Sequence, residues 1–414
     1  MLLGGVHADE LARIYGTPLV TIDVDAIDSA IAALEEACRP HAVEISYAAK
    51  AFVCIAFVRH LATRGGIGLD VCSLGELLTA ERAGFPAQRI TLHGAGKSDA
   101  ELAAAVEGRV GSIAVDGIEE LERLSRAASG SQSCAGVLLR LNTGIAAHTH
   151  EFVRTGGDDT KFGIHPRDEE TAAAILQAHP NLRFAGVHAH IGSQIYQPQA
   201  FTANARALVE GLARFARRGL TGERVVVGGG FGVQMEPSAA DEVLDVRAAI
   251  DGIARCVAHG ANELGLDALR IGIEPGRFIV APAGTTLYRV LAVKRQTSRT
   301  FVVVDGGMAE NPRPALYGAY HHVVPVAQHD GEQHDVTLCG HSCENDELGV
   351  VRLPVDVRAG ELLAMRTTGA YTYSMAGNYN RFERPAVVAV GGGVHRLWIR
   401  RETVDDVLGN DVDV

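Results

Sequence analysis

Three short motifs in this sequence carry groups that could do amine and phosphate chemistry. Lys50 follows an apolar run in SYAAKA, and a lysine that burial keeps partly neutral can attack an aldehyde. Residues 228–232 read GGGFG after the run VVV, and the backbone amides of such a loop can bind phosphate. Glu274 ends a third run in IEPGR, where a carboxylate can pair with a ring nitrogen. Each motif alone also has an ordinary explanation: a solvated lysine, a tight turn, or an ion pair with Arg277.

Two histidines, His188 and His190, lie two residues apart in HAHIGS and would project to the same side of a strand. One interpretation is a metal-dependent hydrolase, which needs further histidines and a carboxylate at other strand ends. The segment 148–151 reads HTHE but lacks the second histidine of HExxH, because residue 154 is arginine. We prefer the other interpretation, in which His190 stacks on a cofactor ring and His188 supports it from the core. No metal site is predicted.

Composition narrows the class of partner. The chain has 414 residues, of which 47% are hydrophobic and 21% are charged, so it can bury a large core. The formal net charge is -12, and an acidic chain disfavours nucleic acid and anionic membranes as partners. We therefore expect a small-molecule substrate, with no nucleic-acid partner and no membrane contact.

The cysteines and the start of the chain indicate a compartment. Seven cysteines are an odd number, and no two form a CxxC pair, which disfavours a disulfide framework or a zinc ribbon. The first residues lack a basic segment followed by an apolar one, and the sequence has no run of eighteen apolar residues. We expect a cytoplasmic protein.

Short apolar runs alternate with helical segments eight times over residues 25–275. The expected strands are 44–48, 67–71, 90–93, 112–115, 136–142, 184–190, 224–228 and 269–274. Helix starts are indicated by a hydroxyl or carboxylate residue three positions before a glutamate, at Ser73/Glu76, Ser98/Glu101 and Asp116/Glu119. Eight such units predict a (β/α)8 barrel, whose reactive groups gather at the carboxyl ends of the strands. Those ends carry Lys50, Asp70, His93, Arg140, Asn142, His190, residues 228–230 and Glu274.

The remainder of the chain has all-β character. From residue 276 onward, Val, Thr and Arg alternate between Gly-rich turns, as in TFVVVDGG and PAVVAVGGGVHRLWIR. The N-terminal segment TPLVTIDVD has the same character. We therefore predict two domains, a barrel at 25–275 and a mostly β domain, sandwich-like or barrel-like, formed by 1–24 and 276–414.

Together these motifs resemble the diaminopimelate decarboxylases, a pyridoxal-phosphate-dependent family with an alanine-racemase-like fold. The resemblance covers nearly the whole chain and rests on YAAKA, GLDVCSLGEL, HGAGKS, HAHIGSQI, GGGFG, EPGRF, VDGGMAENPRPALYGAYH, SCEND and GAYTYSMAGNYN. It implies pyridoxal phosphate as cofactor. It also implies decarboxylation of meso-2,6-diaminopimelate to L-lysine, the last step of lysine biosynthesis.

The resemblance implies a role for each matching residue. Lys50 would hold the cofactor aldehyde, His190 would stack on the ring, and Glu274 would pair with the pyridine nitrogen. Phosphate contacts would come from Ser193, Gly229, Gly230 and Tyr371. Substrate contacts would come from Arg277, Arg313, Tyr317, Glu344 and Tyr371, while Cys343 would deliver a proton to Cα. Ser193 and Cys343 also have plain alternatives, as a turn hydroxyl and a small buried hydrophobe.

One segment departs from the family. Residues 343–347 read CENDE where many members read Cys-Glu-Ser/Thr-Gly-Asp, so a glycine is lost and the last acid is one methylene longer. The surroundings of the distal amino group are therefore open. Related decarboxylases act on ornithine, arginine, carboxynorspermidine or a carrier-bound amino acid. The intact GAY and NYN motifs favour diaminopimelate.

Two further alternatives concern activity and assembly. Catalytically inactive relatives tend to lose the lysine or the cysteine, whereas Lys50, His190, Glu274 and Cys343 are all present here. In the family, two subunits pair head to tail, and the SCEND segment of one reaches the barrel of the other. The resemblance thus implies a homodimer with shared active sites. The competing possibility is that SCEND folds back onto its own barrel.

Overall fold

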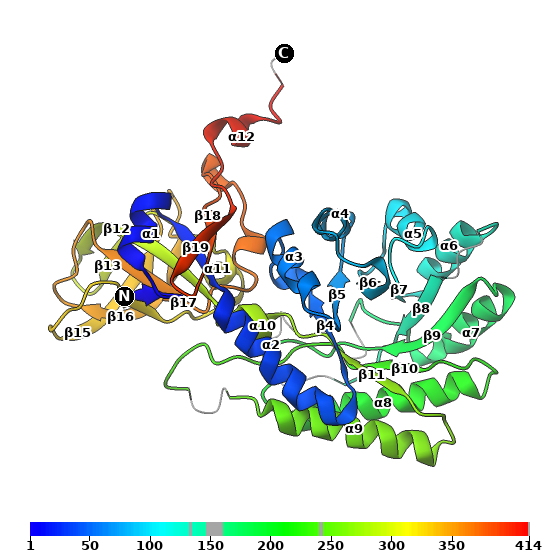
Figure 1. Cartoon of the computed structure of the whole chain (residues 1–414). Coiled ribbons are helices and arrows are strands. Elements are labelled where there is room, and N and C mark those ends of the chain that lie inside the picture. The colour runs from blue at the N-terminus through cyan, green and yellow to red at the C-terminus, as the bar shows by residue number, and fades with distance from the viewer. Residues whose placement is uncertain (132–134, 146–159, 240–242, 413–414) are drawn as a thin grey trace. The chain divides into compact units, whose positions relative to one another are not determined.

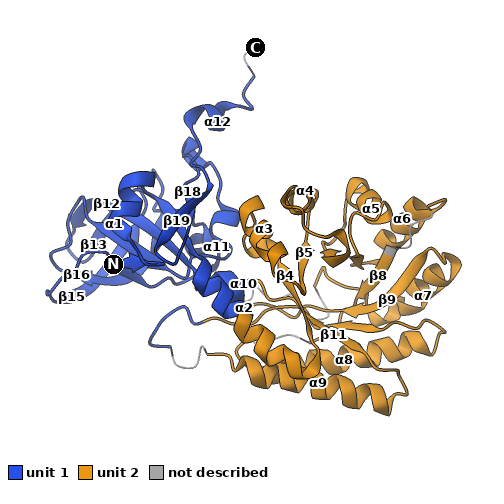
Figure 2. Cartoon of the chain, viewed as in Figure 1, with its two compact units in different colours: residues 1–31, 234–242, 279–414 blue, residues 32–233, 243–278 orange. Residues whose placement is uncertain are grey.

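The computed structural model describes residues 1–131, 135–145, 160–239 and 243–412. The chain forms two compact units (Figure 2). The barrel unit comprises residues 32–233 and 243–278, and the sheet unit comprises residues 1–31, 234–242 and 279–414. The domain boundaries expected from the sequence stay a prediction, because these units are defined by contacts and not by independent folding.

A closed barrel of eight parallel strands forms the centre of the barrel unit (Figure 1). Each expected strand is present, and the fold class is confirmed. Around the barrel, β10 pairs with β11 and β9, and β11 pairs with β4, which closes the ring. The strands are β4 (Glu44–Ala48), β5 (Ile67–Val71), β6 (Ile90–Leu92), β7 (Ser112–Val115), β8 (Ala135–Arg140), β9 (Leu182–His188), β10 (Arg224–Val226) and β11 (Arg270–Ile273).

Helices follow the strands and cover the barrel with apolar faces. In α8, for example, Phe201, Leu208, Leu212 and Phe215 are buried at helical spacing. The helices wholly in the barrel unit are α3 (Ile55–Thr63), α4 (Leu74–Ala83), α5 (Asp99–Val106), α6 (Ile118–Ala128), α7 (Glu169–Ala178), α8 (Pro198–Ala216) and α9 (Val246–Glu263). Two more, α2 (Val24–Cys38) and the short α10 (Arg277–Val280), have residues in both units.

Two of the three expected helix starts are confirmed. Ser73 caps α4 and Ser98 caps α5, each accepting a hydrogen bond from the backbone N–H of the glutamate three residues later. The third expectation, at Asp116, is wrong. The cap of α6 is Gly117, and the Asp116 carboxylate instead accepts a hydrogen bond from Arg140 at 3.1 Å. Asp116 therefore pairs with Arg140 and does not cap the free backbone amides at the start of α6.

The sheet unit is built on strands from both ends of the chain. The N-terminal strand β3 (Leu19–Asp23) pairs antiparallel with β12 (Gly284–Arg295) and parallel with β18 (Ala386–Gly391). Off the path β16-β15-β13-β12-β3-β18-β19, β17 pairs with β12, and β14 pairs with β17. The further strands are β13 (Thr300–Val304), β14 (Val323–Pro325), β15 (Gln333–Cys339), β16 (Glu347–Pro354), β17 (Leu362–Arg366) and β19 (Val394–Ile399).

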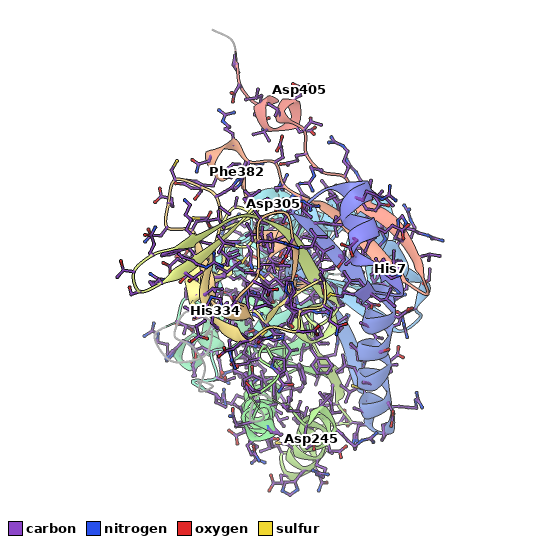
Figure 3. All side chains as sticks on the ribbon, turned by 90° about the vertical axis from the view of Figure 1, so that its left-hand side faces the viewer. His7, Asp245, Asp305, His334, Phe382 and Asp405 are labelled. Carbon is purple, nitrogen blue, oxygen red and sulfur yellow. The ribbon has the colours of Figure 1, made fainter. Side chains whose placement is uncertain are left out.

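Small elements complete the sheet unit. A hairpin of β1 (Leu2–Leu3) and β2 (Val6–His7) precedes α1 (Ala8–Tyr15), while α11 (Arg313–Tyr317) and α12 (Val404–Leu408) follow later. Figure 3 shows the described side chains, including His7 on β2 and His334 on β15. Two apolar clusters form the core, one around Leu19 and Leu287 and one around Tyr288 and Leu338. No helix in the described ranges is long and apolar enough to cross a membrane.

Candidate functional site

Lys50 lies in a short turn directly after barrel strand β4. The buried Tyr47 hydroxyl donates to the Phe52 carbonyl at 2.7 Å and braces this turn. The backbone N–H of Ala48 bonds to the carbonyl of Pro275 at 3.2 Å, which joins the turn to the segment after Glu274. Lys50 itself is exposed in the single subunit. The expectation that burial keeps its amine partly neutral is therefore wrong for the single subunit.

Glu274 lies at the end of β11 and contacts two histidines from other strands. Its side chain is 9% exposed. His188, at the end of β9, bonds through Nε2 to Oε2 of Glu274 at 2.9 Å. His93 follows β6 and places Nε2 3.3 Å from Oε1. His188 is buried here, which agrees with the supporting place in the core that the sequence predicts for it.

The groups in this cluster shift one another's pKa values. Burial alone would raise the pKa of Glu274, but its two imidazole partners hold that pKa well below the usual range. Burial alone would lower the pKa of His93, yet Glu274 and Asp70 raise it to about 9. Burial lowers the pKa of His188 to about 4. At neutral pH, Glu274 is therefore an anion, with His93 as a cation and His188 as a neutral donor.

Asp70 joins the cluster from the end of β5. Its Oδ1 lies 3.6 Å from Nε2 of His93, and burial together with Glu274 raises the pKa of Asp70 to about 6. Neither carboxylate oxygen has a hydrogen-bond partner among the described residues. A cavity of about 260 Å³ inside the barrel reaches Asp70 and Glu274 past the small residues Ser46, Gly68 and Ser112. Water in this cavity can satisfy the oxygens that protein atoms leave open.

The expected phosphate loop is a closely packed backbone cradle. Gly228 and Gly230 have positive φ angles of +79° and +99°. A side chain at Gly229 would collide with the carbonyl of Glu274, and one at Gly230 would collide with that of Gly192. The loop is bonded to the loop after β9, where the Ile195 N–H donates to the Gly230 carbonyl at 2.9 Å. Only glycine permits this approach of three backbone segments.

His190 and Ser193 belong to the loop after β9. Nδ1 of His190 accepts a hydrogen bond from the Gly229 N–H at 3.2 Å. Burial, followed by the charge of Lys50, holds the pKa of His190 well below its usual range, so the ring is neutral. The hydroxyl of Ser193 accepts a bond from Nε of Arg277 at 3.2 Å. Arg277 thus contacts the loop after β9 at an expected phosphate residue, and its contact with a substrate carboxylate stays a prediction.

Three of the expected substrate and phosphate residues meet within the sheet unit. Arg313 is 7% exposed at the start of α11. Its guanidinium lies 5.3 Å from the ring centre of Tyr317 and 5.6 Å from that of Tyr371. Tyr371 has a positive φ of +60°, an unusual conformation for a bulky residue that is often found at functional sites.

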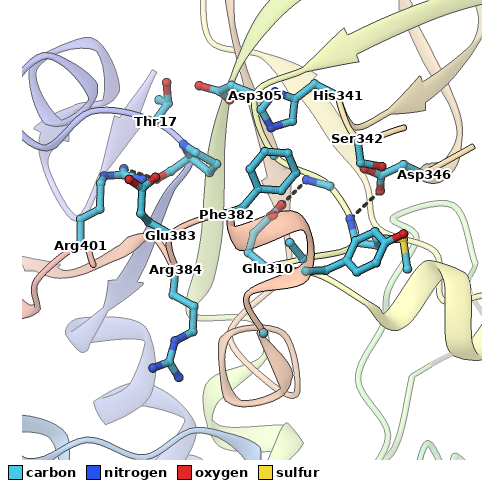
Figure 4. Close-up of a pocket in the computed structure, with 17 residues that line it drawn as sticks. Thr17, Asp305, Glu310, His341, Ser342, Asp346, Phe382, Glu383, Arg384 and Arg401 are labelled. Atoms are coloured by element: carbon cyan, nitrogen blue, oxygen red, sulfur yellow. Dashed lines mark hydrogen bonds between the residues drawn. The ribbon is translucent and has the colours of Figure 1, made fainter. Parts of the chain in front are cut away.

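Cys343 and Glu344 lie on an exposed loop between β15 and β16. Glu344 accepts a hydrogen bond from the Tyr379 hydroxyl at 2.7 Å. The base of the loop borders a pocket of about 240 Å³ in the sheet unit, where the rings of His341 and Phe382 stack 4.5 Å apart (Figure 4). The structure therefore places Cys343 in solvent, and its alternative as a small buried hydrophobe is wrong.

The sequence predicts the strand ends correctly but not the contacts between them. It places Asp70 and His93 at strand ends and predicts no partner for either. The ligand atoms of His93, His188 and Glu274 lie within 4.8 Å of one another, so this trio also meets the geometric demand of the metal-dependent alternative. The HTHE segment at 148–151 lies outside the described residues. Comparison with known proteins decides between the two chemistries.

The family described as pyridoxal-dependent decarboxylase, pyridoxal binding domain, matches residues 24–281. A diaminopimelate decarboxylase of Actinosynnema pretiosum subsp. auranticum is 42% identical over 100% of this chain and 92% of its own length. The diaminopimelate decarboxylase of Bacillus subtilis (strain 168) is 40% identical over 99% of this chain and 94% of its own length.

Solved structures agree. The diaminopimelate decarboxylase of M. jannaschii in complex with L-lysine has a TM-score of 0.91 at 28% identity, covering 100% of this chain and 99% of that chain. The Helicobacter pylori enzyme complexed with L-lysine has a TM-score of 0.87 at 29% identity, covering 97% of this chain and 98% of that one. These matches favour pyridoxal chemistry over the metal-dependent alternative.

The His93 cluster makes stability depend on pH in a defined window. Because the folded-state pKa of His93 is raised from 6.5 to about 9, its stabilising contribution is complete below pH 6.5 and is lost as pH rises through 9. In urea unfolding of the cofactor-free protein, we expect wild type to lose on the order of 2–3 kcal/mol over this window. His93→Gln should lose much less. His259→Gln, at an exposed position on α9, serves as control. Equal pH profiles for wild type and His93→Gln would contradict the assignment.

Proposed function

The chain belongs to the diaminopimelate decarboxylase family of pyridoxal-dependent decarboxylases, and we propose that it converts meso-2,6-diaminopimelate to L-lysine and CO2, the last step of lysine biosynthesis. The observation that carries this proposal is the identity of 40–42% with curated diaminopimelate decarboxylases over essentially the whole chain. The relatives crystallised with L-lysine are consistent with lysine as the product.

Pyridoxal phosphate is the cofactor, and the barrel residues fit it. A lysine amine, a neutral imidazole, an ionised carboxylate and a glycine cradle follow strands of one barrel. Lys50 would hold the aldehyde, His190 would lie against the ring, and Ser193, Gly229, Gly230 and Tyr371 would bind the phosphate. When bound, the cofactor supplies a ring that accepts the electrons left on Cα as CO2 departs.

Glu274 would hold the proton of the pyridine nitrogen in place. A carboxylate does this only while it is ionised, and His188 and His93 keep it so although it is buried. The same contacts fix its orientation, because both oxygens are engaged by imidazole nitrogens from other barrel strands. Asp70 in turn faces His93 and favours the charged form of that ring.

The substrate carries two carboxylates and two ammonium groups, and we assign them to opposite charges on this chain. Arg277 and Arg313 would hold the carboxylate that is not lost, since the guanidinium fork matches a carboxylate. Glu344 would attract the distal ammonium, while Tyr317 and Tyr371 would line the site beside Arg313. When CO2 leaves, Cα needs one proton, and the exposed thiol of Cys343 is our candidate donor.

The assembly we propose is a homodimer with shared active sites. The cofactor residues other than Tyr371 lie in the barrel unit, whereas Tyr371, Cys343 and Glu344 belong to the sheet unit. In a two-fold dimer each sheet unit can serve the partner's barrel, and both sites are equivalent.

We also propose a cytoplasmic location, which agrees with the free thiols of Cys38, Cys54, Cys72, Cys256, Cys339 and Cys343.

The first prediction from the proposed function concerns the cofactor lysine. The sequence has four lysines, Lys50, Lys97, Lys161 and Lys294, so the attachment site can be read without ambiguity. After borohydride reduction of the yellow protein, mass spectrometry should find one pyridoxyl group, on Lys50. Lys50→Ala should carry none, and the matched variant Lys161→Ala should be labelled like wild type. A label on any other lysine, or none, contradicts the site.

The second prediction concerns specificity. Lysine and ornithine lack the distal carboxylate, so the arginine that should bind it would be left without its partner. We expect kcat/KM for both to be roughly a thousandfold or more below that for meso-diaminopimelate, measured by CO2 release. Arg313→Met should narrow this ratio, whereas Arg352→Met, at an exposed position on β16, should not. Comparable turnover of ornithine would favour one of the related decarboxylases.

The third prediction tests the shared site. Lys50→Ala and Cys343→Ala should each be inactive alone. After subunit exchange, a random mixture contains heterodimers with one intact site each, so activity should return to about a quarter of wild type. Mixing Lys50→Ala with Glu274→Ala, both changed in the barrel unit, is the matched control and should stay inactive. If the first mixture stays inactive after proven exchange, each site lies within one subunit.

A further inference from the structure

Asp346 is a buried acid at the base of the loop that carries Cys343 and Glu344. The loop spans residues 340–346, between β15 and β16. Cys343, Glu344 and Asn345 are exposed, whereas Asp346 is only 6% exposed. A carboxylate is rarely buried unless its charge has partners. Asp346 therefore has a structural task that its exposed neighbours do not share.

The partner of this carboxylate is a glycine-rich turn from another part of the sheet unit. Oδ1 of Asp346 accepts a hydrogen bond from the Met308 N–H at 2.6 Å (Figure 4). A side chain on Gly307 or Gly340 would collide with the carboxylate, so both glycines form the slot that it fills. The preceding amide, of Gly307, donates to Glu310 at 2.6 Å. The successive amides of Gly307 and Met308 thus donate to the carboxylates of Glu310 and Asp346, and these two hydrogen bonds fix the turn.

The backbone of Asp346 is also unusual. Its φ is +48°, in the left-handed region that costs most residues about 1–2 kcal/mol and that glycine adopts freely. Many members of the family have glycine at this place in the segment. Here the carbonyl of Asp346 accepts a bond from the Gly340 N–H at 2.9 Å, which closes the base of the loop. The chain keeps the backbone conformation without glycine, and the side chain gains an anchor.

The far side of the loop is held as well. The ring of His341 stacks on Phe382 at an interplanar angle of 14°, and Glu344 accepts the Tyr379 hydroxyl. The loop is therefore attached at three residues, His341, Glu344 and Asp346. Asp346 carries the only buried carboxylate in residues 340–346. Cys343 and Glu344 lie between these attachments.

We infer that Asp346 is a positioning residue, which clamps the loop to the Gly307–Met308 turn and so fixes where Cys343 and Glu344 are presented. The inference rests on the proposed roles of those two residues in decarboxylation. At position 346 this chain lacks the glycine that would adopt the positive φ freely. The charge-assisted hydrogen bond from the Met308 N–H to Asp346 compensates for that loss. Asp346 touches neither substrate nor cofactor in this scheme and acts only through the loop.

Three substitutions separate the side chain from the backbone. Asp346→Gly removes the anchor but fits the positive φ, Asp346→Asn keeps an oxygen acceptor and tolerates this φ, and Asp346→Ala loses both advantages. Asp335→Asn removes a negative charge at an exposed position on β15 and is the matched control. Each holoenzyme is assayed with meso-diaminopimelate, by thermal unfolding, by cofactor absorbance, and by the rate at which iodoacetamide alkylates Cys343.

We expect kcat/KM of Asp346→Gly to fall about tenfold, the size expected for a lost charge-assisted hydrogen bond. Asp346→Asn should return to within about threefold of wild type, and Asp346→Ala should be the most impaired. Cofactor absorbance should not change in any variant, because the cofactor residues of the barrel unit are intact. The alkylation rate of Cys343 should change in the glycine variant and return toward wild type in the asparagine variant.

Three results would overturn the clamp. The first is wild-type kcat/KM and alkylation rate in Asp346→Gly, and the second is equal impairment of the asparagine and glycine variants. The third is a lower unfolding temperature with unchanged kcat/KM, which would reduce Asp346 to a structural residue. If wild type releases no CO2 from diaminopimelate, the proposed function fails. The alkylation rates would still report on the clamp, so the two failures can be told apart.

Discussion

The hydrogen bond between His188 and Glu274 is the contact on which the chemistry proposed for the barrel depends. A carboxylate placed at the end of β11 loses most of its hydration, and without compensation it would take up a proton. His188 from β9 and His93 after β6 supply that compensation, and Asp70 from β5 stabilises the charge on His93. These groups are brought into reach by the closed barrel, so the charge on one acid depends on the arrangement of four of its strands, β5, β6, β9 and β11.

The two units solve the problem of holding reactive groups in different ways. In the barrel unit, each group follows a different strand, and long-range strand pairing sets the distances between them. In the sheet unit, the groups lie in loops and in the short helix α11, and local contacts hold them, such as those of the Arg313 guanidinium with the rings of Tyr317 and Tyr371. Precision in the barrel therefore comes from topology, whereas precision in the sheet unit comes from individual side chains.

Periodicity and strand-end position were enough to predict the barrel, its eight strands and the location of Lys50 and Glu274. The pairing of Glu274 with His93 could not be predicted, because it depends on how two strands distant in sequence face each other across the ring. The exposure of Lys50 and the capture of Asp116 by Arg140 were missed for the same reason. Local sequence patterns predict the helices and strands. Which of several possible side-chain contacts forms depends on the assembled fold.

The N-terminal strand β3 has a consequence for biosynthesis. It is synthesised before the barrel, whereas its neighbours β12 and β18 follow the entire barrel. At ordinary elongation rates the wait is on the order of tens of seconds, longer than many domains need to fold. During translation the barrel can thus be complete while an apolar strand with two open edges is still unpaired. Such an edge is a substrate for chaperones and a hazard for aggregation.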